Sequence, residues 1–250
     1  MKNSLFQFIL TLADDALIIG HRLSEWAYKA PFLEEDIALS NISLDMFGRA
    51  NMLLEYAANI NGKETTPDGL AFKRNEREYY NHLLCEQPNG HFGETIIRQF
   101  LFDSFYSLFL EELVKSSDKE LSAIANKSIK EVTYHFRHSS QWVIRLGDGT
   151  EESHNKMSMA LNKLWQFTDE FFIMDGIDKE MLKKKIGVNR EALKSKWIKK
   201  VDDILYEATL EKPKDVHMLL GGKKGIHTEH LGHILSDMQY LQRAYPDAKW

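Results

Sequence analysis

The chain has 250 residues, with 32 Lys and Arg against 37 Asp and Glu, which gives a net charge of −5 at pH 7. This acidic balance argues against a nucleic-acid binder, which normally carries a basic face. No uncharged apolar run approaches the roughly 18 residues of a membrane span, and no small-residue cleavage site follows the first apolar stretch. The single cysteine, Cys85, excludes an internal disulfide and a cysteine-based metal cage. We therefore expect a soluble, cytoplasmic protein without a membrane partner.

The pattern of residues favours an all-α chain. Strand-forming residues are scarce, and the five prolines fall between apolar periodic segments rather than inside them, as expected where proline ends helices. In chain order, the spacing predicts long helices and then shorter ones near residues 4–29, 34–60, 69–86, 92–115, 119–146, 153–173, 178–186, 189–210 and 226–244.

Side chains that can cap helices stand at two of these boundaries. Ser117 or Asp118 can accept hydrogen bonds from the free amides at the start of the fifth helix, and Thr150 can do so for the sixth. Long helices with short links predict an antiparallel ferritin-like bundle. We expect one domain over residues 1–250, with the bundle core at about 4–173 and additional C-terminal helices at about 178–244.

Several titratable residues fall on the apolar stripes of the predicted helices, where a charge is costly unless it is paired or bound to a metal. They are Asp45 in the second helix, Asp103 in the fourth, and Glu131 and His135 in the fifth. The first helix carries further acids, including Asp14, but the pattern does not show which of them points inward.

Carboxylates that project from four helices into a bundle core are typical of ferritin-like di-iron proteins, where two helices each supply a Glu-x-x-His pair. This sequence lacks that ligand set. The residue three positions after Asp45 is Gly48, and the residue three positions after Glu131 is Tyr134, with His135 one place too late. We therefore interpret Asp45, Asp103, Glu131 and His135 as degenerate metal-site positions.

Two interpretations of the inward acids remain open from the residues alone. In the first, arginines on the same helices pair with the acids across the bundle, and such buried pairs fix register more than they stabilise. In the second, the chain is an independent metal-dependent oxidase that uses Asp45, Asp103, Glu131 and His135 as ligands. The arginines of the first interpretation are Arg22, Arg49, Arg98 and Arg137.

Segments along nearly the whole chain resemble the C subunits of ring-1,2-phenylacetyl-CoA epoxidases, the multicomponent monooxygenases of bacterial phenylacetate degradation. The matching segments are residues 23–26, 38–42, 86–90, 130–135, 162–168 and 221–232.

The resemblance implies a ferritin-like, non-catalytic structural subunit with no cofactor of its own. In this family the di-iron centre lies in the catalytic A subunit, which epoxidises the ring of phenylacetyl-CoA with O₂. Electrons come from NADPH through a reductase that holds FAD and an iron–sulfur cluster. The expected partners are therefore the A subunit, the reductase, other subunits of the complex and phenylacetyl-CoA, with no nucleic acid.

Residues 72–81 mix cations with aromatic side chains, which suit the phosphates and the adenine of coenzyme A. The resemblance implies that two short stretches lie near bound substrate; the alternative is that they are an ordinary amphipathic helix and a helix start. These stretches comprise Glu78, Tyr79, Tyr80 and Asn81, and then Asp178, Lys179 and Glu180.

Two further features point to contacts with other molecules. The basic glycine turn at residues 223–225, which leads into His227 and His230, could bind an anion or pack on a partner subunit. The second helix also carries an apolar stripe that suggests an interface with another subunit. Its residues are Leu39, Met46, Leu53 and Leu54.

Overall fold

The computed structural model describes residues 2–62, 64–246 and 248, and these residues form helices and loops without a strand. The prediction of an all-α chain is confirmed. The chain divides into two compact units. Unit 1 comprises Met1–Lys29, Leu33–Pro88 and Gly221–Trp250, and unit 2 comprises Ala30–Phe32 and Asn89–Leu220.

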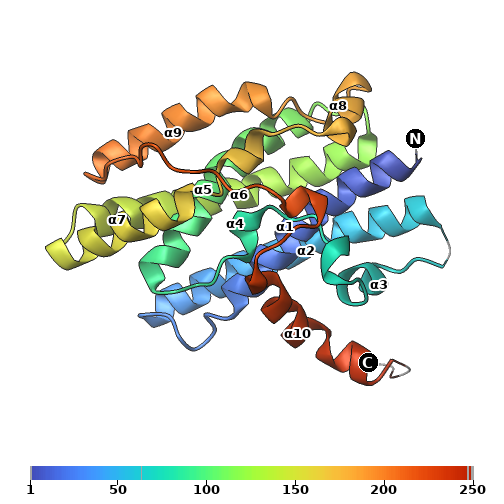
Figure 1. Ribbon diagram of the computed structural model, residues 1–250, viewed down its shortest axis with the longest axis horizontal. Helices are drawn as coiled ribbons and strands as arrows, with labels where there is room; N and C mark the ends of the chain where they lie inside the picture. The colour runs from blue at the N-terminus through green and yellow to red at the C-terminus, as the bar shows by residue number, and fades with distance from the viewer. Residues whose placement is uncertain (1, 63, 247, 249–250) are drawn as a thin grey trace. The chain divides into compact units, whose positions relative to one another are not determined.

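Unit 1 is built on a helical hairpin of α1 and α2 (Figure 1). Ser43 of α2 donates a hydrogen bond of 2.8 Å to the carbonyl of Gly20 in α1. A Cβ atom at Gly20 would lie 3.1 Å from the ring of Phe47, so a residue without a side chain allows this close approach. The elements of unit 1 are α1 (Lys2–Ser24), α2 (Leu33–Asn61), α3 (Pro67–Phe72), η1 (Glu76–Glu78), α4 (Leu83–Glu86), η4 (Gly222–Lys224) and α10 (Glu229–Ala244).

The prediction of one continuous helix over residues 69–86 is wrong. The structure divides this stretch into α3, η1 and α4, with extended backbone at Tyr79 and His82. The side chain of Glu78 accepts a hydrogen bond of 2.7 Å from the amide of Asn75, which closes a capping box around the single turn of η1. Local side-chain bonds of this kind compete with the helical ladder.

Unit 2 contains a pair of long helices, α5 and α6, with shorter helices around them. Both predicted caps form: Asp118 accepts from the amides of Glu120 and Leu121, and Thr150 accepts from the amide of Ser153. The elements of unit 2 are α5 (Phe92–Leu113), α6 (Lys119–Gly147), α7 (Glu151–Trp165), η2 (Asp169–Phe172), α8 (Gly176–Lys183), η3 (Glu191–Leu193) and α9 (Lys194–Glu207).

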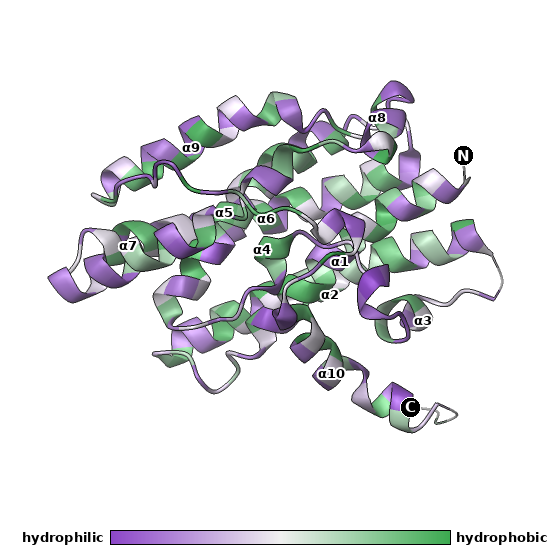
Figure 2. Ribbon diagram, in the orientation of Figure 1, coloured by the Kyte–Doolittle hydropathy of each residue, from purple (hydrophilic) through white to green (hydrophobic). Residues whose placement is uncertain are grey.

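Several predicted helices are shorter in the structure. The helix expected at 4–29 ends at Ser24, and the one expected at 153–173 ends at Trp165 and continues as the short 3₁₀ helix η2. The helix expected at 189–210 is α9, which ends at Glu207. In Figure 2, α9 alternates between hydrophilic and hydrophobic residues along its length, as an amphipathic helix does.

Aromatic side chains fill the core of unit 2. The rings of Phe105 and Phe171 stack with centroids 4.6 Å apart, and Phe172 lies edge-on to Trp197 at 5.3 Å. The indole of Trp197 donates a hydrogen bond of 3.2 Å to the carbonyl of Leu101, so its polar edge is satisfied although it is buried.

Within the described part of the chain, one helix is long and apolar enough to cross a membrane by length and composition. It is the stretch Asn3–Ser24 of α1, and 72% of its most apolar window is buried inside the structure. A core helix of a soluble protein passes the same test, and the two buried carboxylates of Asp14 and Asp15 in its middle are suited to a protein interior that supplies partners.

Candidate functional site

Asp103 of α5 is fully buried, as the sequence predicts, and two neutral side chains donate hydrogen bonds to its carboxylate. One oxygen accepts a hydrogen bond of 2.7 Å from the amide of Gln99, and the other accepts one of 3.0 Å from the hydroxyl of Ser139 on α6. Both oxygens therefore have protein partners within unit 2.

The two predicted ligands of α6 differ in their surroundings. His135 is 1% exposed, whereas Glu131 is half-buried. Tyr134 lies three residues after Glu131, where the Glu-x-x-His pair of a di-iron protein has its histidine, and it is 51% exposed. That position therefore faces away from the interior of unit 2, so a ligand there could not complete an inward Glu-x-x-His pair.

Asp45 of α2 is half-buried, and the position three residues later points to open space. A Cβ atom at Gly48 would meet no heavy atom within 4 Å. Among residues 2–62, 64–246 and 248, no group of three or more His, Cys, Asp and Glu side chains is arranged to hold a metal ion. The residues present do not fit a di-iron ligand set.

Two acids of α1 hold the segment that follows α3. Asp14 binds the guanidinium of Arg74 through both oxygens and also accepts a hydrogen bond of 2.9 Å from the amide of Tyr80. Its neighbour Asp15 accepts from the amide and the ring nitrogen of His82, each at 2.7 Å. The sequence alone did not show which acids of the first helix point inward, and these two are 0% and 1% exposed.

Glu86 at the end of α4 is the centre of a second buried network. Its carboxylate accepts hydrogen bonds from the side chain of Asn81 at 2.9 Å, from the backbone amide and hydroxyl of Thr228 at 2.6 and 2.8 Å, and from His227 at 2.8 Å. Arg22 of α1 donates to the backbone carbonyl of Glu86. This network fastens the C-terminal segment of the chain to α1 and α4.

His227 is held between two acceptors. Its Nδ1 faces Glu86, and its Nε2 lies 2.8 Å from the carbonyl of Tyr79. Burial acts to lower the pKa of His227, but the hydrogen bond and the charge of Glu86 outweigh it, and the pKa is raised above its usual value of 6.5. Both ring nitrogens face a protein partner, so His227 is committed to this network rather than to a metal ion.

The glycine turn before α10 packs against the same segment. A Cβ atom at Gly222 would lie 2.0 Å from the carbonyl of Asn81, and one at Gly225, where φ is +69°, would lie 2.3 Å from the carbonyl of Arg77. The glycines therefore allow two stretches of backbone to approach closely. This contact explains the turn without an anion.

The four predicted substrate residues of unit 1 fall into two pairs. Tyr79 and Asn81 are both 0% exposed. The hydroxyl of Tyr79 donates to the carbonyl of Ala71 and accepts from Gln239, and burial raises its pKa to about 12. Glu78 is exposed and Tyr80 is half-buried. Of these four residues, only Glu78 and Tyr80 can therefore contact a molecule in solution.

The second predicted stretch lies in unit 2 at the start of α8. Asp178 is 3% exposed, forms a capping box with Asp175, and faces Arg190 at 3.4 Å. Lys179 is exposed, and Glu180 is half-buried and pairs with Lys184. Lys179 is therefore the member of this stretch that offers a cation to solvent.

The stripe of α2 that suggested an interface with another subunit is buried inside the chain, because none of its four residues is more than 3% exposed. That basis for the interface is therefore wrong. The apolar side chains that α2 does expose are Leu33 (70%), Ile37 (52%) and Leu44 (64%), which are spaced four and seven residues apart along one face.

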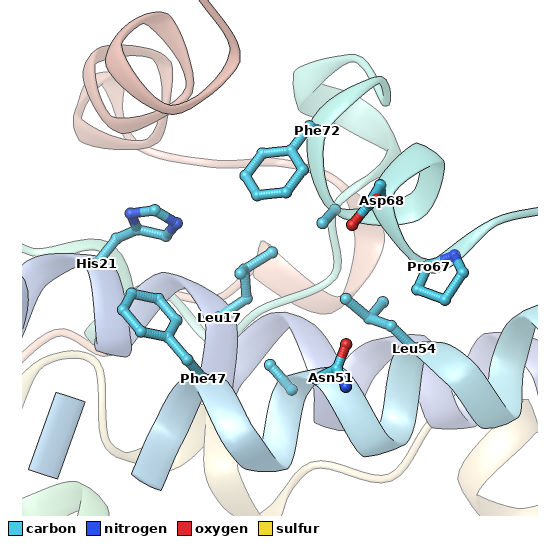
Figure 3. A pocket seen from close by; sticks show the side chains of 10 residues that line it. Leu17, His21, Phe47, Asn51, Leu54, Pro67, Asp68 and Phe72 are labelled. Carbon is cyan, nitrogen blue, oxygen red and sulfur yellow. The ribbon is translucent and has the colours of Figure 1, made fainter. Parts of the chain in front are cut away.

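A cavity of about 330 Å³ lies between α1, α2 and α3 of unit 1 (Figure 3). Sequence analysis did not find it, because its residues come from separate helices and read individually as ordinary core positions. The lining residues are Leu17, His21, Phe47, Ala50, Asn51, Leu54, Pro67, Asp68, Ala71 and Phe72.

The long helix pairs, the acids on their inner faces and the missing ligand positions define a class: a ferritin-like helical protein whose described residues do not match a di-iron ligand set. Residues 1–250 match the family described as "Phenylacetic acid catabolic protein", and the chain belongs to this family. It is 46% identical over 248 residues to the C subunit of the 1,2-phenylacetyl-CoA epoxidase of Escherichia coli (strain K12), an alignment that covers 99% of this chain and 100% of that protein.

Proposed function

We propose that this protein is a structural subunit of a 1,2-phenylacetyl-CoA epoxidase and acts in the catabolism of phenylacetate. The observation that carries the proposal is the 46% identity to the C subunit of such an enzyme over the full length of both chains. Similarity that extends over every helix indicates a shared role in an assembly rather than one shared motif.

The chemistry of the acid positions supports a role without catalysis. Gly48 and Tyr134 occupy positions where a di-iron bundle needs histidines, and the carboxylate of Asp103 is occupied by Gln99 and Ser139. The iron would therefore belong to a partner subunit, and FAD and an iron–sulfur cluster to a reductase component. The alternative, an independent oxidase built on Asp45, Asp103, Glu131 and His135, is not favoured by the full-length similarity.

The outer face of α2 is the surface we assign to another subunit of the epoxidase. Leu33, Ile37 and Leu44 expose apolar side chains at helical spacing, and Gly48 continues the face with a bare backbone. A helix of a partner can approach closely at a glycine, and apolar residues at the centre of an interface supply much of its stability.

Each unit has its own candidate for substrate contact, which is the accessible part of the predicted stretch in that unit. Lys179 offers a cation for a phosphate of coenzyme A, and Tyr80 offers part of an aromatic ring. The buried members, Tyr79, Asn81 and Asp178, would act by holding these neighbours in place. We place the protein in the cytoplasm, where acyl-CoA and NADPH are available.

Co-purification with the catalytic subunit tests this function. We expect the wild-type chain to elute with that subunit as one complex, and Ile37→Asp with Leu44→Asp to reduce the recovered complex at least tenfold. The matched control is Glu55→Asp, also on the exposed side of α2, which should elute as the wild type does. A complex that survives the double substitution would reject the assigned face, and a wild-type chain that never associates would reject the function.

A further inference from the structure

We propose that the cavity between α1, α2 and α3 is a binding site for a small, uncharged aromatic molecule with one ring and a short polar substituent. The site lies within unit 1; it includes none of the predicted metal-site positions, and it shares only Phe72 with the stretch 72–81 considered for coenzyme A. It adds a ligand to the proposed structural role and does not depend on that role.

The size and lining of the cavity set the class of ligand. An engineered apolar cavity of about 150 Å³ is known to bind benzene, so about 330 Å³ admits a ring with a short substituent. Leu17, Ala50, Leu54 and Ala71 are each less than 5% exposed and form the apolar floor. The floor of the cavity is thus built from buried core residues.

Aromatic side chains border the space. Figure 3 shows Phe72 on α3 across from the α1–α2 hairpin, where Phe47 lies beside His21. The rings of Phe47 and His21 meet edge-on, with centroids 4.9 Å apart. A flat ligand placed between Phe47 and Phe72 would meet aromatic surface on opposite sides, an arrangement that stabilises aromatic pairs beyond the area they bury.

The charge around the cavity selects against anions. Burial lowers the pKa of His21 to about 4, so its imidazole is neutral at pH 7 and can exchange one hydrogen bond with a hydroxyl or an amide. The one charged side chain among the lining residues is the exposed carboxylate of Asp68. A carboxylate ligand would meet this like charge and no cation among the lining residues.

The surface beside the cavity argues for a small molecule rather than a partner's side chain. The lining residue Asn51 is exposed and donates a hydrogen bond of 2.9 Å to the exposed carboxylate of Glu55, whereas the apolar residues that α2 exposes lie closer to its N-terminus. The centre of a protein–protein interface is depleted in charged side chains, and this rim carries both Glu55 and Asp68.

Titration of the full-length chain with benzyl alcohol and with benzoate, followed by NMR of the His21 ring protons, tests the site. We expect saturable shifts of the His21 signals with benzyl alcohol and at least tenfold weaker binding of benzoate. Ala71→Leu should reduce the affinity for benzyl alcohol at least tenfold by filling the cavity, whereas the same change at an exposed position of α6, Ala123→Leu, should leave it unchanged.

A second variant keeps the proposal testable if Ala71→Leu fails to fold. Asp68→Asn removes an exposed charge from the rim. It should reduce the ratio of the benzyl alcohol affinity to the benzoate affinity at least threefold. Three results would each overturn the proposal. The His21 shifts could fail to saturate, or the wild type could bind both probes equally. The chain could also lose its affinity for benzyl alcohol when the catalytic subunit is bound. The last of these outcomes would assign the cavity to a side chain of the partner.

Discussion

The two units of this chain differ in what their buried side chains hold together. In unit 1, charged and polar groups are buried as networks: Asp14 with Arg74, and Glu86 with His227 and Thr228. Unit 2 also buries polar pairs, such as Asp103 with Gln99, but its core is built around ring contacts such as the stack of Phe105 on Phe171. The difference follows from the backbone, because unit 1 must hold a long irregular segment whose amides need partners, whereas α5 satisfies its own.

This comparison makes Glu86→Ala the most damaging single change. It would leave His227 and Asn81 without their shared acceptor inside unit 1, and removal of one member of a buried charged network typically costs about 3–5 kcal/mol. Chemical denaturation followed by circular dichroism measures the loss. The control, Glu152→Ala, removes an exposed ion pair with Lys156 and should leave the midpoint unchanged. Equal midpoints for both variants would contradict a structural role for the network.

Phe105→Leu should have a smaller effect, because the site stays apolar. The variant keeps most of the buried area and loses the stack on Phe171, with an expected cost of about 1–2 kcal/mol in the free energy of unfolding. Tyr206→Leu is a control on an aromatic residue that is 88% exposed, and it should be neutral. A loss as large as that of Glu86→Ala would show that both units depend on directional contacts.

Thr150→Ala removes the cap of α7 in unit 2. The side chain accepts a hydrogen bond of 3.2 Å from the amide of Ser153, and loss of such a cap typically costs about 1 kcal/mol. Thr150→Ser keeps the acceptor and should retain the wild-type midpoint. If the serine variant lost as much stability as the alanine variant, loss of the cap would not explain the lower midpoint of the alanine variant.

The pH dependence of unit 1 should give the smallest effect, because deprotonation of His227 removes one ring donor only. Its pKa is raised in the folded state, so the stabilisation is fully present below the unfolded value near 6.5 and is lost as the pH rises through the folded value. The difference in unfolding free energy between wild type and His227→Gln should therefore shrink with rising pH. His217→Gln, at an exposed position, is the control and should show no such trend. A difference that grows with pH would contradict the assignment.

Regular helices with an apolar stripe could be predicted from the sequence, and so could their local caps. The break in the helix expected at 69–86 could not, because its cause is distant in the chain. Asp14 and Asp15 accept hydrogen bonds from the backbone amides of Tyr80 and His82. In a continuous helix, these amides would donate to backbone carbonyls four residues earlier. Periodicity reports neighbours three and four residues apart, so a carboxylate more than sixty residues away leaves no such signal.

The candidate site divides in the same way. The absent ligands at Gly48 and Tyr134 follow from spacing within one helix, and the exposure of both residues agrees with that interpretation. The role of Glu86 and the cavity beside His21 depend on helices brought together by folding. Residues such as Leu17 and Ala71 carry no chemistry that distinguishes a cavity wall from an ordinary core position.

We propose, as the centre of this account, that the chain serves an oxygen-activating partner and does not activate oxygen itself. Iron content and epoxidation of phenylacetyl-CoA, measured for the chain alone and for the chain co-expressed with its catalytic partner and supplied with reductase and NADPH, test it most directly. We predict iron and product for the complex only, with the iron remaining on the partner after the subunits are separated. Stoichiometric iron and epoxide formation with the isolated chain would contradict the account.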